Sequence, residues 1–420
     1  MKKLIALLLA MVMVLGMAAC GAPATDAPET TAAAGTETQP DGTETQGEEV
    51  DASDLKVGFI FLHDENSTYD KNFIDAAVAA CDEMGVTMVQ KTQIPESNAC
   101  YDAAVELIEV EECDIIFADS FGHESFLMQA AEEYPEVQFC HATGTQAHTA
   151  KLDNFHNAFA SIYQGRYAAG VVAGLKLNEM IAAGDITAEE AKMGYVGAFT
   201  FAEVMSGYTS FYLGAKSVCP SVTMDVKFTG SWYDETKEKQ AAEALISGGC
   251  VLISQHADSM GAPTACENAG VPNVSYNGST AAACPETFLI SSRIDWAPYF
   301  KYMITQVAKG EAIDTDWTGT LETGSVKLTE LGKNVAEGTQ EKLDEVIAGL
   351  NDGTINVFDT ANFTVNGETI TSYMADVDTD EAFTPDTEVI ENGIFMESKF
   401  RSGPYFDVRI DGITLLDEAY

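Results

Sequence analysis

The chain is 420 residues long and strongly acidic, with 66 aspartate and glutamate residues against 22 lysine and arginine residues and a formal net charge of −44 at pH 7. This charge argues against nucleic acid, anionic membrane surfaces and multiply phosphorylated molecules as partners, and it favours a neutral or cationic ligand. The 366 residues from 55 to 420 exceed what one hydrophobic core usually organises, so we expect two lobes.

The first twenty residues have the pattern of a bacterial lipoprotein signal. Lys2 and Lys3 precede an apolar run from Leu4 to Leu15, and small residues stand immediately before Cys20. A transmembrane anchor is the alternative, but the apolar run is shorter than the roughly 20 residues needed to span a bilayer. We therefore interpret residues 1–20 as a lipoprotein signal that is cleaved just before Cys20. We expect lipidation of Cys20 with a fatty acid such as palmitate, and a location on the extracytoplasmic face of a bacterial cell membrane.

Residues 21–54 consist almost entirely of small, polar and acidic residues, with Val50 as the only large apolar side chain. Such a segment buries too little apolar surface to offset the entropy lost on ordering. The sequence therefore predicts a disordered acidic linker between the lipid and the folded body.

From residue 56 onward, short apolar runs of strand length alternate with segments of helical spacing. In the first half, strands are expected near 56–61, 87–90, 114–118 and 137–140, with helices near 73–84, 99–110 and 126–134 between them. Alternation of this kind is typical of a parallel sheet covered by helices on both faces.

The same alternation restarts near residue 154 and continues through a second unit. Strands are expected near 193–197, 224–228, 251–254 and 274–277, with helices near 165–175, 204–218 and 236–247. The fold class predicted is α/β, with two doubly wound parallel-sheet lobes, a hinge and a cleft where the carboxyl ends of the strands meet. We expect the N-terminal lobe to comprise 55–160 and about 285–312, and the C-terminal lobe 161–284 and about 313–358.

The last sixty residues have a different pattern. Asn366-Gly367 and Asp411-Gly412 each lie between alternating segments, which predicts two β-hairpins with type I′ turns. Residues 359–420 are therefore expected to form a β-hairpin extension packed on the C-terminal lobe.

Eight cysteines remain after Cys20, and six histidines are spread along the chain. Several of the cysteines lie in apolar runs, which favours free buried thiols, with one or two disulfides as the alternative. No histidine pair has the H-x-x-x-H spacing, and no motif of a nucleophilic hydrolase or a nucleotide-hydrolysing loop is present. We expect no metal, no cofactor and no enzymatic activity.

Three segments together resemble the basic membrane protein (BMP) family. They are Tyr69–Phe73 at the start of the first helix, Gln164–Gly170 at the start of the second lobe, and Leu213–Lys216 in the following helix. The family consists of substrate-binding lipoproteins of ABC importers with a type I periplasmic-binding fold. Its characterised PnrA-like and Med-like relatives bind purine nucleosides or bases, so the resemblance implies this ligand class, an ABC permease and a separate ATPase subunit as partners.

The resemblance also assigns roles to particular positions. The helix start that carries ligand contacts in the family corresponds to Asp70, Asn72 and Phe73, and the phenylalanine is expected to stack on a base. Ile74 stands where the family has an asparagine, residues 255–259 replace its glycine-rich loop, and Asn277 replaces the acidic residue that holds the ribose. These departures resemble a subgroup in which Trp232 and Trp296 join the site.

Most candidate ligand contacts come from expected strand ends, where loops face the cleft. Aromatic rings there suit a flat heteroaromatic ligand, and amides, hydroxyls, imidazoles and carboxyls suit ring nitrogens and sugar hydroxyls. The candidates are Asn66, Tyr69, Asp70, Phe73, Ser120, Phe121, His141, Trp232, Gln255, His256, Asp258, Asn277 and Trp296.

The sequence thus predicts a monomeric solute receptor that captures a purine nucleoside or base between its lobes and delivers it to a permease. Two alternatives remain open at this point. One is a receptor of the same fold that signals without transport, and the other is a lipid-anchored nucleoside hydrolase.

Overall fold

The structure is a computed structural model that describes residues 51–378 and 387–420. The predicted signal, Cys20 and most of the predicted linker lie outside these residues. Within the described part of the chain, no helix is both long enough and apolar enough to cross a membrane.

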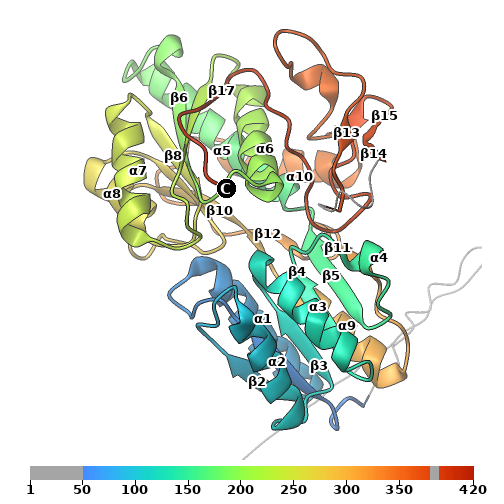
Figure 1. Cartoon of the computed structure of the whole chain (residues 1–420). Coiled ribbons are helices and arrows are strands. Elements are labelled where there is room, and N and C mark those ends of the chain that lie inside the picture. Colours follow the sequence, from blue (N-terminus) through green and yellow to red (C-terminus); the bar gives the residue numbers. More distant parts are fainter. Residues whose placement is uncertain (1–50, 379–386) are drawn as a thin grey trace, which may run out of the picture. The chain divides into compact units, whose positions relative to one another are not determined.

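The N-terminal lobe is built on a six-stranded sheet in the order β11-β5-β4-β3-β1-β2, with every neighbouring pair parallel (Figure 1). Its strands are β1 (Lys56–Ile60), β2 (Thr87–Lys91), β3 (Ile115–Ala118), β4 (Gln138–Ala142), β5 (Phe155–Ala160) and β11 (Asp316–Gly319). Helices α1 (Thr68–Met84) and α9 (Ala297–Lys309) pack together on one face, and α2 (Asn98–Glu109) and α3 (Glu124–Glu133) pack together on the other.

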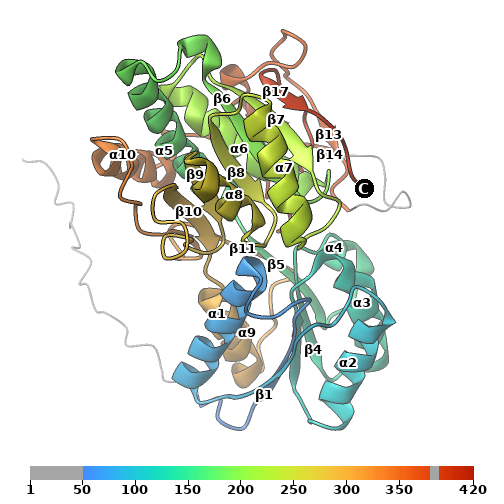
Figure 2. The ribbon, with the colours of Figure 1, turned by 90° about the vertical axis from the view of Figure 1, so that its left-hand side faces the viewer.

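The C-terminal lobe contains a seven-stranded sheet in the order β12-β10-β9-β8-β6-β7-β17. Its strands are β6 (Lys192–Gly197), β7 (Thr223–Phe228), β8 (Leu252–His256), β9 (Asn273–Tyr276), β10 (Phe288–Ile294), β12 (Val326–Leu328) and β17 (Ile413–Leu415). Only the pairing of β12 with β10 is antiparallel within this sheet. The layer of α7 (Glu235–Ser247) and α8 (Gly261–Ala269) covers one face, and α5 (Ile162–Ala183) and α6 (Ala202–Val218) cover the other (Figure 2). The predicted α/β fold class is confirmed.

Two glycines allow α5 and α6 to lie in direct backbone contact. A Cβ atom on Gly170 would lie 2.0 Å from the carbonyl oxygen of Phe211, and one on Gly214 would lie 2.0 Å from the carbonyl oxygen of Tyr167. Any side chain at either position would force the helices apart. The glycines of the two C-terminal-lobe segments that resemble the BMP family therefore have a packing role.

The chain passes between the lobes three times, and the last two passages differ from the expected boundaries. Strand β10 belongs to the C-terminal sheet, although 285–312 was assigned to the N-terminal lobe. Helix α9 packs on α1, and β11 lies at the edge of the N-terminal sheet beside β5, although β11 falls in the range assigned to the C-terminal lobe. The predicted boundaries 285–312 and 313–358 are therefore wrong, because the second N-terminal-lobe segment runs from about α9 to β11.

Of the remaining elements, α10 (Thr339–Asn351) is the longest, and it packs against α5. The others are short. Helix α4 (Ala147–Ala150) follows β4, and β13 (Met374–Ala375), β14 (Thr387–Glu388), β15 (Ile390–Glu391) and β16 (Ile394–Phe395) form two small antiparallel ribbons in the C-terminal extension.

One of the two predicted hairpins is present and the other is not. Val365 and Glu368 exchange backbone hydrogen bonds around Asn366 and Gly367, whose φ values of 53° and 83° fit the type I′ turn. By contrast, β17 follows Gly412 and pairs in parallel with β7 instead of folding back on the preceding residues. The second hairpin prediction is wrong because a free edge of the C-terminal sheet is the partner of this strand.

Candidate ligand-binding site

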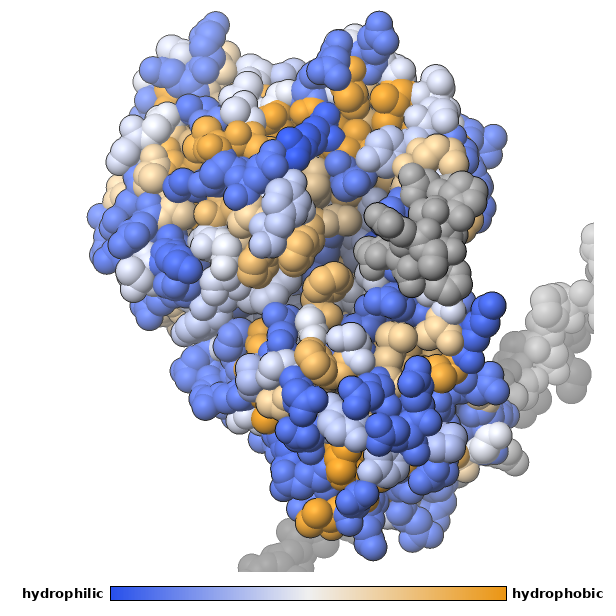
Figure 3. Space-filling view, viewed as in Figure 1, coloured by the Kyte–Doolittle hydropathy of each residue, from blue (hydrophilic) through white to orange (hydrophobic). Residues whose placement is uncertain are grey.

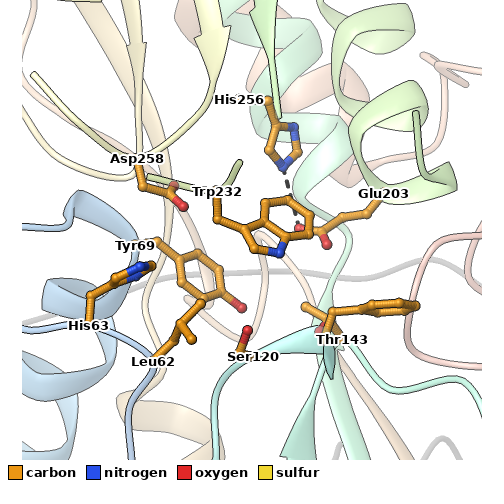
Figure 4. A pocket seen from close by; sticks show the side chains of 10 residues that line it. Leu62, His63, Tyr69, Ser120, Thr143, Glu203, Trp232, His256 and Asp258 are labelled. Atoms are coloured by element: carbon orange, nitrogen blue, oxygen red, sulfur yellow. Dashed lines mark hydrogen bonds and ion pairs between the residues drawn. The ribbon is translucent and has the colours of Figure 1, made fainter. Parts of the chain in front are cut away.

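A cavity lies where the carboxyl ends of strands from both sheets converge, and we call it the central cavity (Figure 4). The rule that ligands bind beyond the carboxyl ends of parallel strands points to the same location. The lining residues are Leu62, His63, Tyr69, Ser120, Phe121, Thr143, Glu203, Trp232, His256 and Asp258.

Aromatic rings from both lobes form the apolar walls of the central cavity. The Trp232 ring lies 5.1 Å from Phe199 in an edge-on arrangement, and Phe121 of the N-terminal lobe lies 5.4 Å from Phe201 of the C-terminal lobe. Tyr69 turns its hydroxyl to donate a 2.8 Å hydrogen bond to the backbone oxygen of Asp119. A flat ring between such walls gains stacking energy from each face.

The polar groups of the central cavity are imidazoles, hydroxyls and carboxyls. His256 Nε2 lies 3.4 Å from Glu203 Oε1, and burial lowers the pKa of His256 despite this carboxylate. Burial, reinforced by Glu238 and Asp70, raises the pKa of Asp258 well above its ordinary value. A neutral imidazole and a carboxyl held toward its neutral form can each both donate and accept a hydrogen bond. Among the described residues, no lysine or arginine lines this cavity.

Two buried carboxyls, Asp70 and Asp119, contact residues that line the cavity: Asp70 accepts from the His63 amide, and the Asp119 carbonyl accepts from the Tyr69 hydroxyl. Burial would raise the pKa of Asp70, but hydrogen bonds from His63 and Ser67 lower it on balance. Burial and the nearby Asp70 raise the pKa of Asp119 well above its usual range. The negative charge of the pair therefore resides on Asp70, next to His63 at the cavity edge.

Direct contacts join the two lobes around the central cavity. The Thr68 amide donates to the Asp258 carbonyl at 3.0 Å, and Asn72 Nδ2 donates to Asn277 Oδ1 at 3.1 Å. The central cavity itself measures about 20 Å³, which is close to the space of one water molecule. A ligand the size of a base therefore enters only when the lobes or the lining side chains move apart.

The structure brings six of the predicted site residues together in the central cavity. They are Tyr69, Ser120, Phe121, Trp232, His256 and Asp258. Asn66 lines a neighbouring cavity of about 450 Å³, where its amide donates to Asp64 at 2.8 Å.

Phe73 and Trp296 lie elsewhere, contrary to the expectation that they contact a ligand. Both are almost completely buried, and their rings stack on each other with centroids 4.3 Å apart in the core between α1 and α9. The reason is that Phe73 lies on the face of α1 that packs against α9. The roles assigned to these two rings are therefore corrected to core packing.

The remaining four predicted residues are buried near the site without lining it. His141 Nε2 lies 2.7 Å from the carbonyl oxygen of Ser120, and Asp70 binds the His63 amide at 2.6 Å. Gln255 is buried in β8, and Asn277 adopts a positive φ of 64° just after β9. None of the four lines the central cavity.

Four lining residues were not among the candidates, namely Leu62, His63, Thr143 and Glu203. Leu62 and His63 follow β1, Thr143 follows β4, and Glu203 opens α6 after β6. The strand-end rule that selected Ser120 and Trp232 applies equally to these positions. It would have found them if it had been applied to every strand.

A buried arginine under the site was also missed. Arg166 Nη2 donates to the Gln255 carbonyl at 2.7 Å, and the guanidinium lies 4.0 Å from the centre of the Tyr276 ring. Arg166 therefore fixes the end of β8, from which His256 projects into the central cavity.

The eight cysteines in the described residues are all buried and free of disulfide bonds. Within the same residues, no group of three or more histidine, cysteine, aspartate or glutamate side chains is arranged to hold a metal ion.

Comparison with known protein families decides the assignment of the chain. Residues 60–357 match the Bmp model, described as ABC transporter substrate-binding protein PnrA-like. The chain belongs to the BMP family. Its two-lobed architecture also places it in the type I periplasmic-binding fold, and both expectations from the sequence resemblance are confirmed.

Two relatives of this BMP-family chain carry names that state a ligand. A purine-binding protein of Brucella abortus is 30% identical over 313 residues, which cover 72% of this chain and 83% of that protein. A Haloferax volcanii protein named for glucose binding in an ABC transporter is 34% identical over 236 residues. That alignment spans only 56% of the length of each protein.

Solved structures agree with the fold. A solute-binding protein of an ABC transporter system from Aeropyrum pernix superimposes with a TM-score of 0.62 at 17% identity, and it covers 75% of this chain and 94% of that chain. At this identity the likeness supports the shared two-lobed architecture alone.

Proposed function

We propose that this protein is an extracytoplasmic, lipid-anchored receptor that captures an uncharged purine nucleoside or purine base and delivers it to an ABC permease. The observation that carries the proposal is the central cavity, which combines aromatic walls from both lobes with neutral hydrogen-bonding groups. Its lining, as far as residues 51–378 and 387–420 form it, contains no lysine or arginine. The 30% identical purine-binding relative supports the same ligand class.

The lining groups fit the two parts of a purine nucleoside. Tyr69, Phe121 and Trp232 offer ring faces to a base, while His256 can both donate to and accept from its edge. Glu203 and Asp258 suit hydroxyl and amino donors, and the Glu203 carboxylate would repel the phosphate of a nucleotide. The cavity therefore favours the unphosphorylated compound.

Capture follows from the placement of these groups on both lobes. A ligand in the open cleft touches one lobe, and closure adds the contacts of the other, so binding shifts the population toward the closed form. Closure also removes water from the polar groups, so a wrong ligand would leave them unpaired at a cost of about 1 to 3 kcal/mol each. The closed form would then be the one that docks on the permease.

A sugar is the second candidate, because the name of the Haloferax volcanii relative states glucose binding. Carboxylates and aromatic faces also suit a sugar ring with its hydroxyls. The purine is favoured because the alignment with the purine-binding relative covers more of both chains.

Mass spectrometry of small molecules that co-purify with the protein tests the proposal, followed by calorimetry with adenosine, inosine, guanosine, their free bases, the monophosphates and glucose. Binding of a nucleoside or base, with at least hundredfold weaker binding of the monophosphates, is expected. Binding of glucose without any purine would replace the first candidate with the second. Release of free base from an incubated nucleoside would show a hydrolase and refute function by binding alone.

A further inference from the structure

The C-terminal extension lies outside the part of the chain that matches the BMP family, which ends at residue 357. We call residues 397–407 of this extension the strap. The strap and its flanking segments contact both lobes, and one edge of the strap lines a cavity that adjoins the central cavity. Figure 3 shows that the molecular surface is hollowed between the two lobes on this side.

The extension is held firmly on the C-terminal lobe. Strand β17 pairs with β7, and Asp417 accepts hydrogen bonds from Lys227 at 2.6 Å and from the Phe228 amide at 2.7 Å. The strap itself begins at the buried Glu397, which accepts a hydrogen bond from Ser206 of α6 at 2.5 Å. These contacts make the extension part of the C-terminal lobe when the lobes move.

The middle of the strap reaches the N-terminal lobe. The amide and the hydroxyl of Ser402 both donate to Asp316 Oδ1 of β11, each at 2.9 Å. Gly403 lies so close to the loop after β4 that a Cβ atom there would be 2.8 Å from the Gly144 oxygen and 3.2 Å from the Thr143 oxygen. Opening of the cleft by separation of these surfaces must break the Ser402–Asp316 contact.

The strap is stiff enough to transmit this contact. Arg401 is only 4% exposed, and its guanidinium donates to the carbonyls of Gly403 and Pro404 at 3.0 and 2.7 Å. The carbonyls of the loop are thereby fixed around one side chain. A loop fixed in this way holds Ser402 in position and loses little entropy when it contacts the other lobe.

The cavity beside the strap joins the strap to the ligand site. It measures about 450 Å³ and is lined by the strap residues Arg401, Pro404, Tyr405 and Asp407 together with residues of both lobes. Phe121, Thr143 and Glu203 line both this cavity and the central cavity.

We propose that the strap is a third wall of the ligand cleft that latches the N-terminal lobe to the C-terminal lobe and slows the release of ligand. The ligand part of this proposal depends on the proposed function, whereas the latch between the lobes does not. In the closed form the strap adds contacts that the open form lacks, so it raises the closed population even before ligand binds.

Fluorescence energy transfer in the full-length protein tests the latch without any ligand. Dyes on Val110→Cys in the N-terminal lobe and Glu243→Cys in the C-terminal lobe occupy exposed positions, whereas the eight native thiols of the described residues are buried. Cys20, the ninth cysteine, is replaced by serine in this experiment so that it takes up no dye. The distance distribution is compared among the wild-type strap, Gly403→Ala, Ser402→Ala and the control Lys399→Ala. In the described residues, the Lys399 ammonium pairs with Glu391 of the extension and lies over the ring of Phe400 in the strap, without contacting the N-terminal lobe.

We expect Gly403→Ala and Ser402→Ala to shift the distribution toward longer interlobe distances. We also expect them to speed ligand dissociation roughly tenfold, which is the change that loss of a hydrogen bond to a charged group produces. Lys399→Ala should behave as the wild type. If Gly403→Ala disturbs folding, as thermal unfolding would show, Ser402→Ala remains informative because it removes only a hydroxyl.

Unchanged distances in both strap variants would overturn the latch. Shifted distances in a protein that binds no purine would support the latch and refute the proposed ligand. Shifted distances with unchanged dissociation of a bound purine would refute the effect of the strap on ligand release.

Discussion

Trp232 and Phe73 have different assigned roles: Trp232 is expected to stack on the ligand, whereas Phe73 packs in the core. Replacing each by alanine and comparing the two variants tests this difference. Trp232 is only partly buried and lines the central cavity, whereas Phe73 is fully buried against Trp296. Loss of one stacking face costs about 1 to 3 kcal/mol, which corresponds to a roughly 5- to 150-fold weaker dissociation constant. We expect this loss of affinity for Trp232→Ala in calorimetry.

Phe73→Ala should have the opposite profile. It removes a ring that lies 4.3 Å from Trp296 and 4.8 Å from Tyr69, centroid to centroid, so the free energy of unfolding should fall by about 3 to 5 kcal/mol. Ligand affinity, measured at a temperature where the variant is folded, should change by less than about threefold because the ring does not line the cavity. Denaturant unfolding and calorimetry measure the two quantities separately. Unchanged affinity in Trp232→Ala, or a large loss of affinity in a fully folded Phe73→Ala, would refute the assignment of the two rings.

Three further predictions concern the extension, the anchor and the fold. Burial raises the pKa of Glu397 from 4.5 to about 7, so its stabilising contribution is complete below pH 4.5 and falls by about 3 kcal/mol as the pH rises through 7. In urea unfolding, Glu397→Gln should reduce the dependence of the free energy of unfolding on pH. An unchanged pH dependence would contradict this assignment. Cys20→Ser should release the chain from the membrane fraction on cell fractionation, and retention there would refute the lipid anchor. Gly170→Ala places a Cβ atom 2.0 Å from the Phe211 oxygen and should lower the free energy of unfolding by about 1 to 3 kcal/mol; wild-type stability would show that α5 and α6 can separate freely.

The alternation of strands and helices could be predicted because each buried parallel strand is a short apolar run. The first strand was expected at 56–61 and lies at Lys56–Ile60, and the strand expected at 193–197 lies at Lys192–Gly197. The position of the site was also predictable, because the carboxyl ends of these strands determine which loops face the cleft.

The errors have long-range contacts as their common cause. Local sequence does not show that the Phe73 ring meets Trp296, more than two hundred residues away, and so turns away from the cleft. It also does not show that Ile413–Leu415 pairs with β7 instead of folding back at Gly412. Glu203 differs, because its place at a strand end was visible in the sequence.

Titration calorimetry of the purified protein with adenosine, adenine, adenosine monophosphate and glucose tests the central claim most directly. The account predicts tight binding of the nucleoside or its base, and at least hundredfold weaker binding of the phosphate and the sugar, because carboxylates and neutral groups line the cavity. Preferential binding of adenosine monophosphate or glucose would contradict it.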